Sequence, residues 1–346
     1  MNGKMKEGLP PLLCEKPRIL ILGTFPGEKS LDKMEYYSDP RNRFWKIIAA
    51  LFSPLPYTDL CLNSFEDKKE LLKQAHIALW DVYSVVKRKG SLDRNIVDRI
   101  EIDCQSLIKI LRENPSIEKI AFNGDEAKKT YAEGYQNKIQ AAFPKRNISL
   151  AKLPSSSNSN RLYNDVSKLI EKWFEQFSIT GLDAVWGDKP KTLILGTFPG
   201  KESLNSKEYY SNSKNRFWDL VGYDKDPEDY NQKIKFLDNK RIALWDIYER
   251  VIRDGSSDKG FAKGSYNNVF ERIKNHPSIK TIILTGVSEN AKAHYLGFIR
   301  HFHKEIEDAK KERNLQIFLL PSTSPQNGNT DGLIAKWNQF FPKKER

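Results

Sequence analysis

The chain has 346 residues, of which 39% are hydrophobic and 29% are charged, a composition typical of a soluble globular protein. No apolar run reaches the length of a membrane span and the N-terminus lacks a signal-peptide core, so we expect a cytoplasmic protein without a membrane partner. The net charge of +12 favours a polyanionic partner such as nucleic acid, although it also fits a merely basic surface.

The cysteines give no sign of a metal cluster. Cys14, Cys61 and Cys104 all lie in the first half and far apart, which is typical of reduced thiols rather than disulfides. Their number and spacing also argue against a zinc site or an iron–sulfur cluster. We therefore expect neither a metal nor a cofactor.

The predicted elements alternate between apolar strands and amphipathic helices. In chain order they are strand 18–24 (RILILGT), helix 42–52 (NRFWKIIAALF), strand 77–83 (IALWDVY), helix 105–114 (QSLIKILREN), strands 117–124 (IEKIAFNG) and 147–155 (NISLAKLPS), and helix 162–177 (LYNDVSKLIEKWFEQF). This alternation predicts an α/β domain with a mainly parallel sheet that helices cover on both faces.

A long repeat shows that this pattern occurs twice. Residues 18–45 (RILILGTFPGEKSLDKMEYYSDPRNRFW) and 191–218 (KTLILGTFPGKESLNSKEYYSNSKNRFW) are identical at 18 of 28 positions. Later blocks return in the same order, including IALWD, and LPSSSNSN returns as LPSTSPQN. A period of about 170 residues matches a whole domain. We predict a tandem duplication with domains at 1–178 and 190–346, a linker at 179–189, and a monomer that is an internal pseudo-dimer.

The repeated polar motifs follow the predicted strands. Parallel α/β sheets bind their ligands beyond the carboxyl ends of the strands, so GTFPG, LWD, FNG and LPSSS predict one site in each half. The loop residues are Gly23, Thr24, Phe25, Pro26 and Gly27, and in the second half Gly196, Thr197, Phe198, Pro199 and Gly200. The glycines permit a tight turn and close approach of a ligand, and the phenylalanine offers a face for stacking on a base. The same loop also fits an ordinary strand-to-helix turn with a core phenylalanine, and it is not a phosphate-binding P-loop.

Two further residue types are candidates for chemistry. Asn42 and Asn215 precede Arg-Phe-Trp, where each can cap a helix or orient a water molecule or a base. Asp81 and Asp246 end a strand, where each can cap a helix, pair with an arginine or stabilise a developing cation.

Taken in order, the motifs resemble the uracil-DNA glycosylase superfamily. The blocks are a GxxPG-type loop, YY-x-x-P-x-N-x-F-W, LWD with R-x-G-S-x-D, F-N-G and L-P-S-T-S-P, and they are most similar to the hypoxanthine-DNA glycosylase family. The resemblance covers nearly all of both halves. It implies two tandem three-layer α/β/α domains, each around a four-stranded parallel sheet, and excision of a flipped base from DNA without a metal or cofactor.

The resemblance also implies residue roles. Phe25 and Phe198 stand where most of the superfamily has a water-positioning Asp or Asn, and Asn42 and Asn215 take over a catalytic role, with Asp81 and Asp246 as further catalytic residues. The base-binding residues are the two GTFPG loops, Tyr37, Asn123, Tyr210 and Thr285. The DNA-binding residues are Ser155, Ser156, Ser157, Arg88, Ser322, Thr323, Ser324 and Arg253.

Neither half matches the family pattern throughout. The first keeps YYSDPRNRFW and FNG but ends in LPSSSNSN, and the second keeps LPSTSP but has Thr285 where the first has Asn123. We favour the first half as the catalytic copy, with the second gripping DNA. The leading hypothesis is a monofunctional DNA glycosylase, acting on hypoxanthine or uracil in repair or on a modified base of phage DNA in defence. The alternatives are a non-catalytic sensor of damaged or modified bases and an enzyme like the nucleoside hydrolases.

Overall fold

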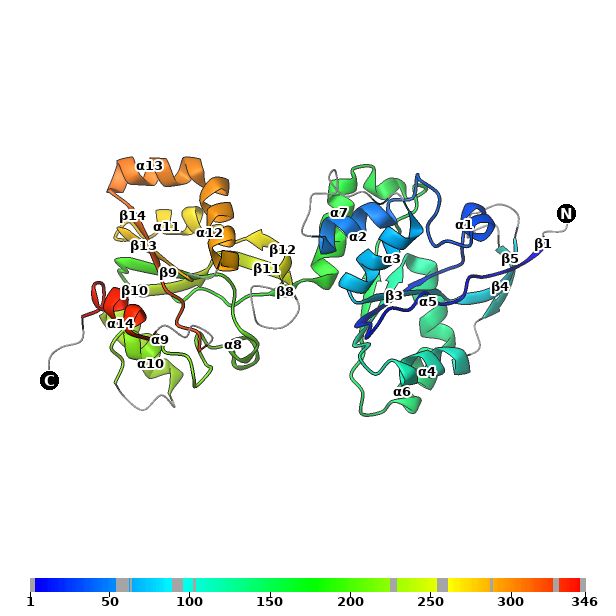
Figure 1. Cartoon of the computed structure of the whole chain (residues 1–346), viewed down its shortest axis with the longest axis horizontal. Coiled ribbons are helices and arrows are strands. Elements are labelled where there is room, and N and C mark those ends of the chain that lie inside the picture. Colours follow the sequence, from blue (N-terminus) through cyan, green and yellow to red (C-terminus); the bar gives the residue numbers. More distant parts are fainter. Residues whose placement is uncertain are drawn as a thin grey trace. The chain divides into compact units, whose positions relative to one another are not determined.

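The chain divides into two compact units, Met1–Phe177 and Ser178–Arg346, which we describe one at a time (Figure 1). The computed structural model describes residues 4–53, 62, 64–88, 96–101, 104–224, 229–253, 261–286, 289–325 and 330–342. Cys61, one of the predicted thiols, lies outside these ranges, and Cys14 and Cys104 are free thiols. Within the described residues, no helix is both long and apolar enough to span a membrane.

A four-stranded parallel sheet forms the centre of the first unit, in the order β3-β2-β6-β7. Its strands are β2 (Ile19–Gly23), β3 (Ile77–Asp81), β6 (Lys119–Asn123) and β7 (Ser149–Leu153). Successive side chains such as Leu20, Ile21 and Leu22 are all buried although they point to opposite faces. Strands of this continuously apolar kind need helices on both faces.

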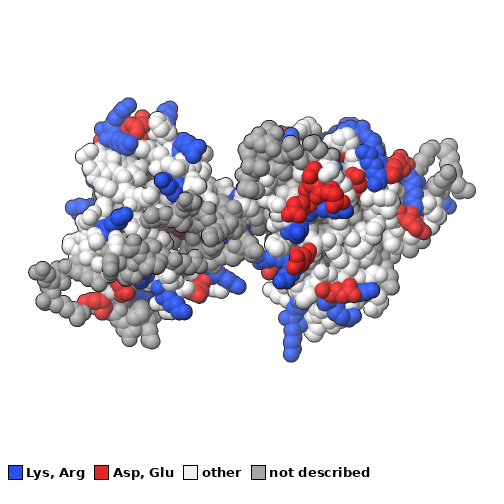
Figure 2. Space-filling model, in the orientation of Figure 1, with Lys and Arg blue, Asp and Glu red and all other residues white. Residues whose placement is uncertain are grey.

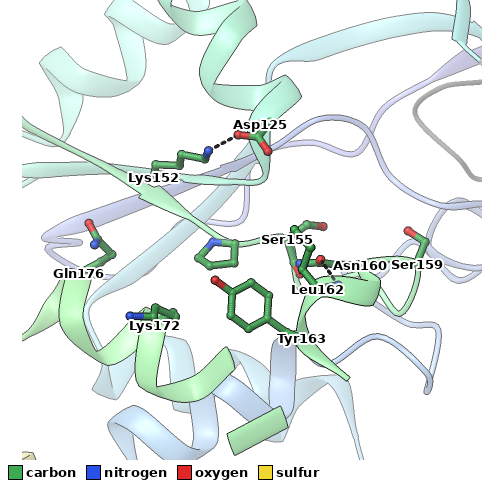
Figure 3. Close-up of a pocket in the computed structure, with 10 residues that line it drawn as sticks. Asp125, Lys152, Ser155, Ser159, Asn160, Leu162, Tyr163, Lys172 and Gln176 are labelled. Atoms are coloured by element: carbon green, nitrogen blue, oxygen red, sulfur yellow. Dashed lines mark hydrogen bonds and ion pairs between the residues drawn. The ribbon is translucent and has the colours of Figure 1, made fainter. Parts of the chain in front are cut away.

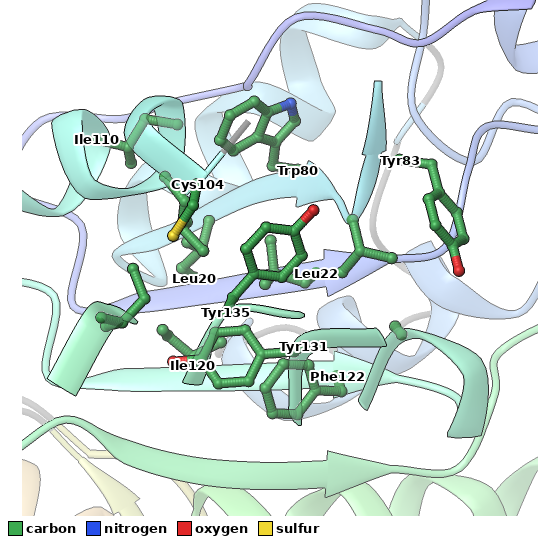
Figure 4. Close-up of a cluster of buried hydrophobic side chains, with 14 of the residues drawn as sticks. Leu20, Leu22, Trp80, Tyr83, Cys104, Ile110, Ile120, Phe122, Tyr131 and Tyr135 are labelled. Carbon is green, nitrogen blue, oxygen red and sulfur yellow. The ribbon is translucent and has the colours of Figure 1, made fainter. Parts of the chain in front are cut away.

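Helices cover both faces of this sheet (Figure 1). Leu20, Leu22, Ile120 and Phe122 pack with α4, α5 and α6 on one face, where Figure 4 shows Tyr131 and Tyr135 against the strands. On the other face, α2 contacts α3 and α7. The helices of this unit are α1 (Glu28–Lys33), α2 (Phe44–Phe52), α3 (Phe65–Gln74), α4 (Cys104–Glu113), α5 (Asp125–Gly134), α6 (Gln136–Ala142), the 3₁₀ turn η3 (Arg161–Tyr163) and α7 (Val166–Phe177).

The second unit repeats this three-layer arrangement, with the sheet order β10-β9-β13-β14. Its parallel strands are β9 (Thr192–Gly196), β10 (Ile242–Asp246), β13 (Thr281–Thr285) and β14 (Gln316–Leu320). Its helices are α8 (Lys201–Ser206), α9 (Phe217–Leu220), α10 (Tyr230–Asn239), α11 (Val269–Lys274), α12 (Glu289–His301), α13 (His303–Arg313) and α14 (Thr330–Asn338). Side chains of α11, α12 and α13 fill one core and those of α9, α10 and α14 the other. The predicted α/β fold with two tandem four-stranded parallel sheets is confirmed.

Each unit also has a small antiparallel sheet that the sequence analysis did not predict. In the first unit its order is β1-β4-β5, with β1 (Lys4–Glu7), β4 (Tyr83–Arg88) and β5 (Ile96–Glu101). The predicted strand 77–83 is therefore two strands, which meet at Val82, whose N–H donates to the carbonyl of Gly23 at 2.9 Å. In the second unit the order is β12-β11-β8, with β8 (Ile179–Thr180), β11 (Tyr248–Arg253) and β12 (Phe261–Tyr266).

The segment 179–189, predicted as a linker, packs within the second unit. Its first residues form β8, which pairs with β11, and Val185 forms an antiparallel bridge with Leu244. In the first unit, β1 pairs with β4 and Leu12 bridges to Leu79 in the same way. Residues 4–17 and 178–190 are thus equivalent first segments of the two copies, although little sequence identity remains between them.

Candidate functional site

The carboxyl ends of β2, β3 and β6 bring Gly23, Asp81 and Asn123 to one edge of the first sheet. Gly23 and Asp81 lie side by side in register, and a Cβ added to Gly23 would clash with Asp81 Oδ1 and lie 3.2 Å from the hydroxyl of Tyr37. The first glycine of GTFPG is needed because a buried carboxylate passes over it. The second unit repeats this geometry, with Asp246 Oδ1 2.5 Å from a Cβ built on Gly196.

The second tyrosine of each Tyr-Tyr pair has a left-handed backbone, with φ of 52° at Tyr37 and 55° at Tyr210. This conformation is uncommon for a bulky residue and costs free energy, so surrounding contacts must hold it. The Tyr37 ring stacks on Phe44 at 3.8 Å, and the Tyr210 ring on Phe217 at the same distance. Burial raises the pKa of Tyr210, and the negative charge of Asp246 raises it further. Each unit therefore fixes one tyrosine near its carboxylate.

Asn123 connects this tyrosine to the serine loop. Its Nδ2 donates to the hydroxyls of Tyr37 at 3.0 Å and Ser156 at 2.9 Å, and its Oδ1 accepts from the Ser156 N–H at 2.9 Å. Both amide hydrogens are thus used within the protein, and a base can reach only the remaining lone pair of Oδ1. In the second unit, Thr285 instead donates to the carbonyl of Leu195 at 3.4 Å.

Asn42 caps a helix with only one end of its amide. Its Oδ1 accepts from the N–H of Phe44 at 3.0 Å, at the start of α2, and its own N–H donates to the carbonyl of Asp39 at 2.8 Å. Its Nδ2 has no hydrogen-bond partner among the described residues. Asn215 caps α9 in the same way, by accepting from the N–H of Phe217 at 3.0 Å. Helix capping therefore leaves one donor group in each unit available for a ligand.

The structure corrects the assignment of Arg88 and Arg253 to DNA binding, because these side chains are only 1% and 9% exposed. Each guanidinium lies over the ring of the loop phenylalanine, with its carbon 4.9 Å from the ring centre of Phe25 and 4.7 Å from that of Phe198. Each also donates to the carbonyl of the following proline, Pro26 or Pro199. The arginines hold the GTFPG loops from within.

The same contacts limit the role expected for the phenylalanines. Phe25 and Phe198 are buried, and an arginine covers one face of each ring. Thr24 and Thr197 are buried as well. Gly200, in contrast, has nothing within 4 Å of an added Cβ, so this last glycine of the loop is not required by a neighbour. The loops are thus packed turns more than open stacking platforms.

The sequence analysis missed Arg43, which fixes the serine loop 155–157. Its guanidinium donates to the carbonyls of Ser157 at 2.5 Å, Asn160 at 3.3 Å and Tyr163, and its N–H donates to the carbonyl of Ser156 at 3.1 Å. Partial burial lowers the pKa of Arg43 from its ordinary value, although arginine stays charged at neutral pH.

The equivalent arginine of the second unit is Arg216. Its N–H donates to the carbonyl of Thr323 at 3.1 Å, and its guanidinium donates to that of Ser324 at 3.5 Å. The identity of this arginine between the two Asn-Arg-Phe-Trp blocks was a signal that could have found it. In both loops the middle residue, Ser156 or Thr323, is buried. Ser155, Ser157, Ser322 and Ser324 are partly exposed.

The described residues contain no group of three or more His, Cys, Asp or Glu side chains that could hold a metal ion. The polar groups at the strand ends are amides, hydroxyls and a single buried carboxylate in each unit. Such a set can orient a substrate by hydrogen bonds and stabilise charge that develops on it.

Comparisons with known proteins point to one group. The family model described as the Uracil DNA glycosylase superfamily matches residues 10–178. The hypoxanthine DNA glycosylase of Methanosarcina barkeri is 34% identical over 160 residues, which are 45% of this chain and 89% of that protein. The one of Methanosarcina acetivorans is 32% identical over 164 residues, 46% of this chain and 91% of that protein. Each relative thus matches about half of a duplicated chain.

A solved structure also matches. It is the solution NMR structure of a Methanosarcina acetivorans protein described provisionally as a uracil DNA glycosylase. It is 30% identical, with a TM-score of 0.38, and the match covers 49% of this chain and 96% of that protein.

Proposed function

The chain belongs to the uracil DNA glycosylase superfamily, and from this premise we propose that it is a monofunctional DNA glycosylase whose first unit is the catalytic copy. It flips a base out of DNA and hydrolyses the N-glycosidic bond, leaving an abasic site. Breaking this bond places positive charge on the sugar and negative charge on the departing base. The enzyme must stabilise both charges.

The amide of Asn42 is the observation that carries the proposal. Because the N–H of Phe44 engages Oδ1, the amide is held in one orientation and presents Nδ2 as a donor. A donor suits a departing base that gains negative charge. Asp81, buried at the neighbouring strand end, supplies negative charge that favours the cationic sugar.

The serine loop supports a role in holding DNA. Arg43 fixes the backbone of this loop, and the partly exposed hydroxyls of Ser155 and Ser157 can donate to phosphates. Leu162 follows the loop in η3 and is 90% exposed, which is unusual for a leucine. An apolar side chain in this position can fill the gap that a flipped nucleotide leaves in the base stack.

The second unit keeps Asn215, Asp246 and Tyr210 but lacks the amide at position 285. A threonine hydroxyl has one donor hydrogen, whereas the Asn123 amide donates to two hydroxyls, and on this difference we assign the second unit to gripping DNA. The net charge of +12 on the whole chain favours binding to the phosphates of DNA.

The two relatives are named for hypoxanthine, so hypoxanthine is the first substrate to test. Oligonucleotides with hypoxanthine, uracil, a thymine mismatch or a phage-type modified cytosine are incubated with the protein and then with alkali, which cleaves the strand at abasic sites. We expect cleavage of one substrate after alkali and none without it. Cleavage without alkali would show a lyase step and contradict the monofunctional assignment.

A further inference from the structure

A cavity of about 420 Å³ opens beside the serine loop of the first unit (Figure 3). Its walls come from the end of β7, the loop that follows it, η3 and the outer face of α7. Pockets that bind small organic groups have volumes in this range. Ser155 and Leu162, to which the proposed function gives contacts with DNA, form part of its lining, and the other lining residues have no role above.

The lining combines an aromatic ring with amides and hydroxyls. Figure 3 shows the Tyr163 ring between Lys172 on one side and Asn160 on the other, with Gln176 beyond the lysine. Asn160 donates from Nδ2 to the carbonyl of Ser155 at 2.9 Å and accepts at Oδ1 from the N–H of Leu162 at 3.3 Å, which leaves one amide hydrogen and one lone pair for a ligand. The Gln176 amide adds a donor and an acceptor, which is the chemistry that reads the edge of a base, and the Tyr163 ring offers a face for stacking.

The charges of the cavity are largely offset. Lys152 forms an ion pair with Asp125, and Lys172 pairs with Glu175 at 2.8 Å. A site for a phosphate needs uncompensated positive charge, which these pairs reduce. The lining therefore suits a neutral base better than a phosphate.

The cavity is fixed to the catalytic site through the backbone. Arg43, the neighbour of Asn42, holds the carbonyls of Asn160 and Tyr163, and Trp173 donates from Nε1 to the carbonyl of Pro154 at 2.9 Å. A ligand in the cavity therefore lies at a fixed offset from Asn42.

The second unit provides an internal comparison. Trp337 donates to the carbonyl of Pro321 at 3.0 Å as Trp173 does to Pro154, which aligns the two helices. Leu319, 45% exposed, then replaces Lys152, and Phe340, which contacts Phe318 at 4.9 Å, replaces Gln176. At these two positions the first unit is polar and the second apolar, whereas Ser155 and Lys172 keep polar counterparts in Ser322 and Lys336.

We infer that this cavity binds an unpaired nucleobase adjacent to the flipped nucleotide, so that the first unit reads the sequence next to its target. The inference rests on the proposed function, because it needs the catalytic site to act on DNA. It predicts a dependence of base release on the flanking nucleotide.

The test removes the flanking base from the DNA and the Tyr163 ring from the protein, each separately. Oligonucleotides that contain hypoxanthine carry either a normal flanking nucleotide or a tetrahydrofuran abasic analogue, on each side in turn. Binding and kcat/KM are measured for the wild type, Tyr163→Ala and Gln176→Ala. Lys336→Ala, on the matching helix of the second unit, is the control. Circular dichroism checks that each variant is folded. If Tyr163→Ala does not fold, Gln176→Ala serves in its place, because Gln176 is exposed and its substitution should not disturb the core.

We expect loss of the flanking base on one side to weaken binding by the wild type about fivefold to a hundredfold. Tyr163→Ala should cause a similar loss on normal DNA and none on the abasic DNA, and Lys336→Ala should cause none. Two results would overturn this inference alone, provided that the DNA is still bound and cleaved. One is that the losses of affinity from the abasic flank and from Tyr163→Ala add together, and the other is that neither change weakens binding. Failure to bind DNA at any salt concentration would overturn the proposed function as well.

Discussion

At position 42, one amide group caps α2 with its oxygen and leaves its nitrogen available. The structural and chemical roles that the sequence left as alternatives are thus carried by different atoms of the same side chain. They can be separated by substitution.

Asn42→Asp keeps an oxygen acceptor for the Phe44 N–H and removes the Nδ2 donor. We expect the free energy of unfolding to stay within about 0.5 kcal/mol of the wild type, whereas Asn42→Ala should lower it by about 1 kcal/mol. Both variants should lose base release by a factor of about 100 or more. Urea denaturation and single-turnover cleavage measure the two effects. An Asp variant with full activity would contradict the donor role.

Arg43 acts through the loop that it holds. Arg43→Ala removes charged hydrogen bonds to several carbonyls, each worth about 1.5–3 kcal/mol when buried and less at this partly exposed position. We expect lower stability of the first unit and weaker DNA binding, with Arg216→Ala affecting only the second unit. Limited proteolysis of the 155–164 segment measures the change. Equal protection of this segment in the variant and the wild type would show that Arg43 does not fix it.

At the scale of elements, the two glycines of the turn after β9 have different surroundings. Gly196→Ala places a Cβ 2.5 Å from Asp246 Oδ1, and Gly200→Ala meets nothing. We expect the first change to lower the free energy of unfolding by about 1–3 kcal/mol and the second to change it by less than about 0.5 kcal/mol. Thermal unfolding of the two variants checks this, and equal effects would contradict the close approach of Asp246.

Burial of Tyr131 in α5 makes the first unit sensitive to alkali. Burial raises the pKa of Tyr131 from 10.0 to about 12. A raised pKa gives stability that is complete below pH 10 and is lost as the pH rises from 10 to about 12. Tyr131→Phe should therefore lose less free energy of unfolding than the wild type over this range, by up to about 3 kcal/mol. Identical alkaline profiles of the two proteins would refute this.

The sequence predicted the parallel sheets because their strands are continuous apolar runs that end in repeated turn motifs. It did not predict the antiparallel sheets, because Tyr83–Arg88 follows Ile77–Asp81 after one residue and reads as its continuation. Arg88 was misassigned because a sequence shows a charge but not that a phenylalanine ring covers it. The bonds of Asn123 to Tyr37 and Ser156 depend on three separate segments meeting, which only the fold reveals.

At the scale of the molecule, positive charge is spread widely. On the face shown in Figure 2, lysines and arginines occur over both units and are interspersed with carboxylates. Such a distribution favours binding to phosphates through many weak contacts.

We therefore expect strong salt dependence of DNA binding. The affinity should fall at least about tenfold between 50 and 200 mM salt, because each phosphate contact releases counterions. Fluorescence anisotropy with unmodified duplex measures this, and an affinity independent of salt would contradict a DNA substrate.

A single assay of both copies decides whether the first unit carries out base release. Base release from hypoxanthine DNA is measured for the wild type, Asn42→Ala and Asn215→Ala, with DNA binding measured in parallel. We expect Asn42→Ala to abolish release, Asn215→Ala to retain it, and both variants to bind DNA. Loss of release with Asn215→Ala alone would place the chemistry in the second unit. The absence of release by the wild type from every DNA tested, with intact DNA binding, would contradict the glycosylase and indicate a sensor.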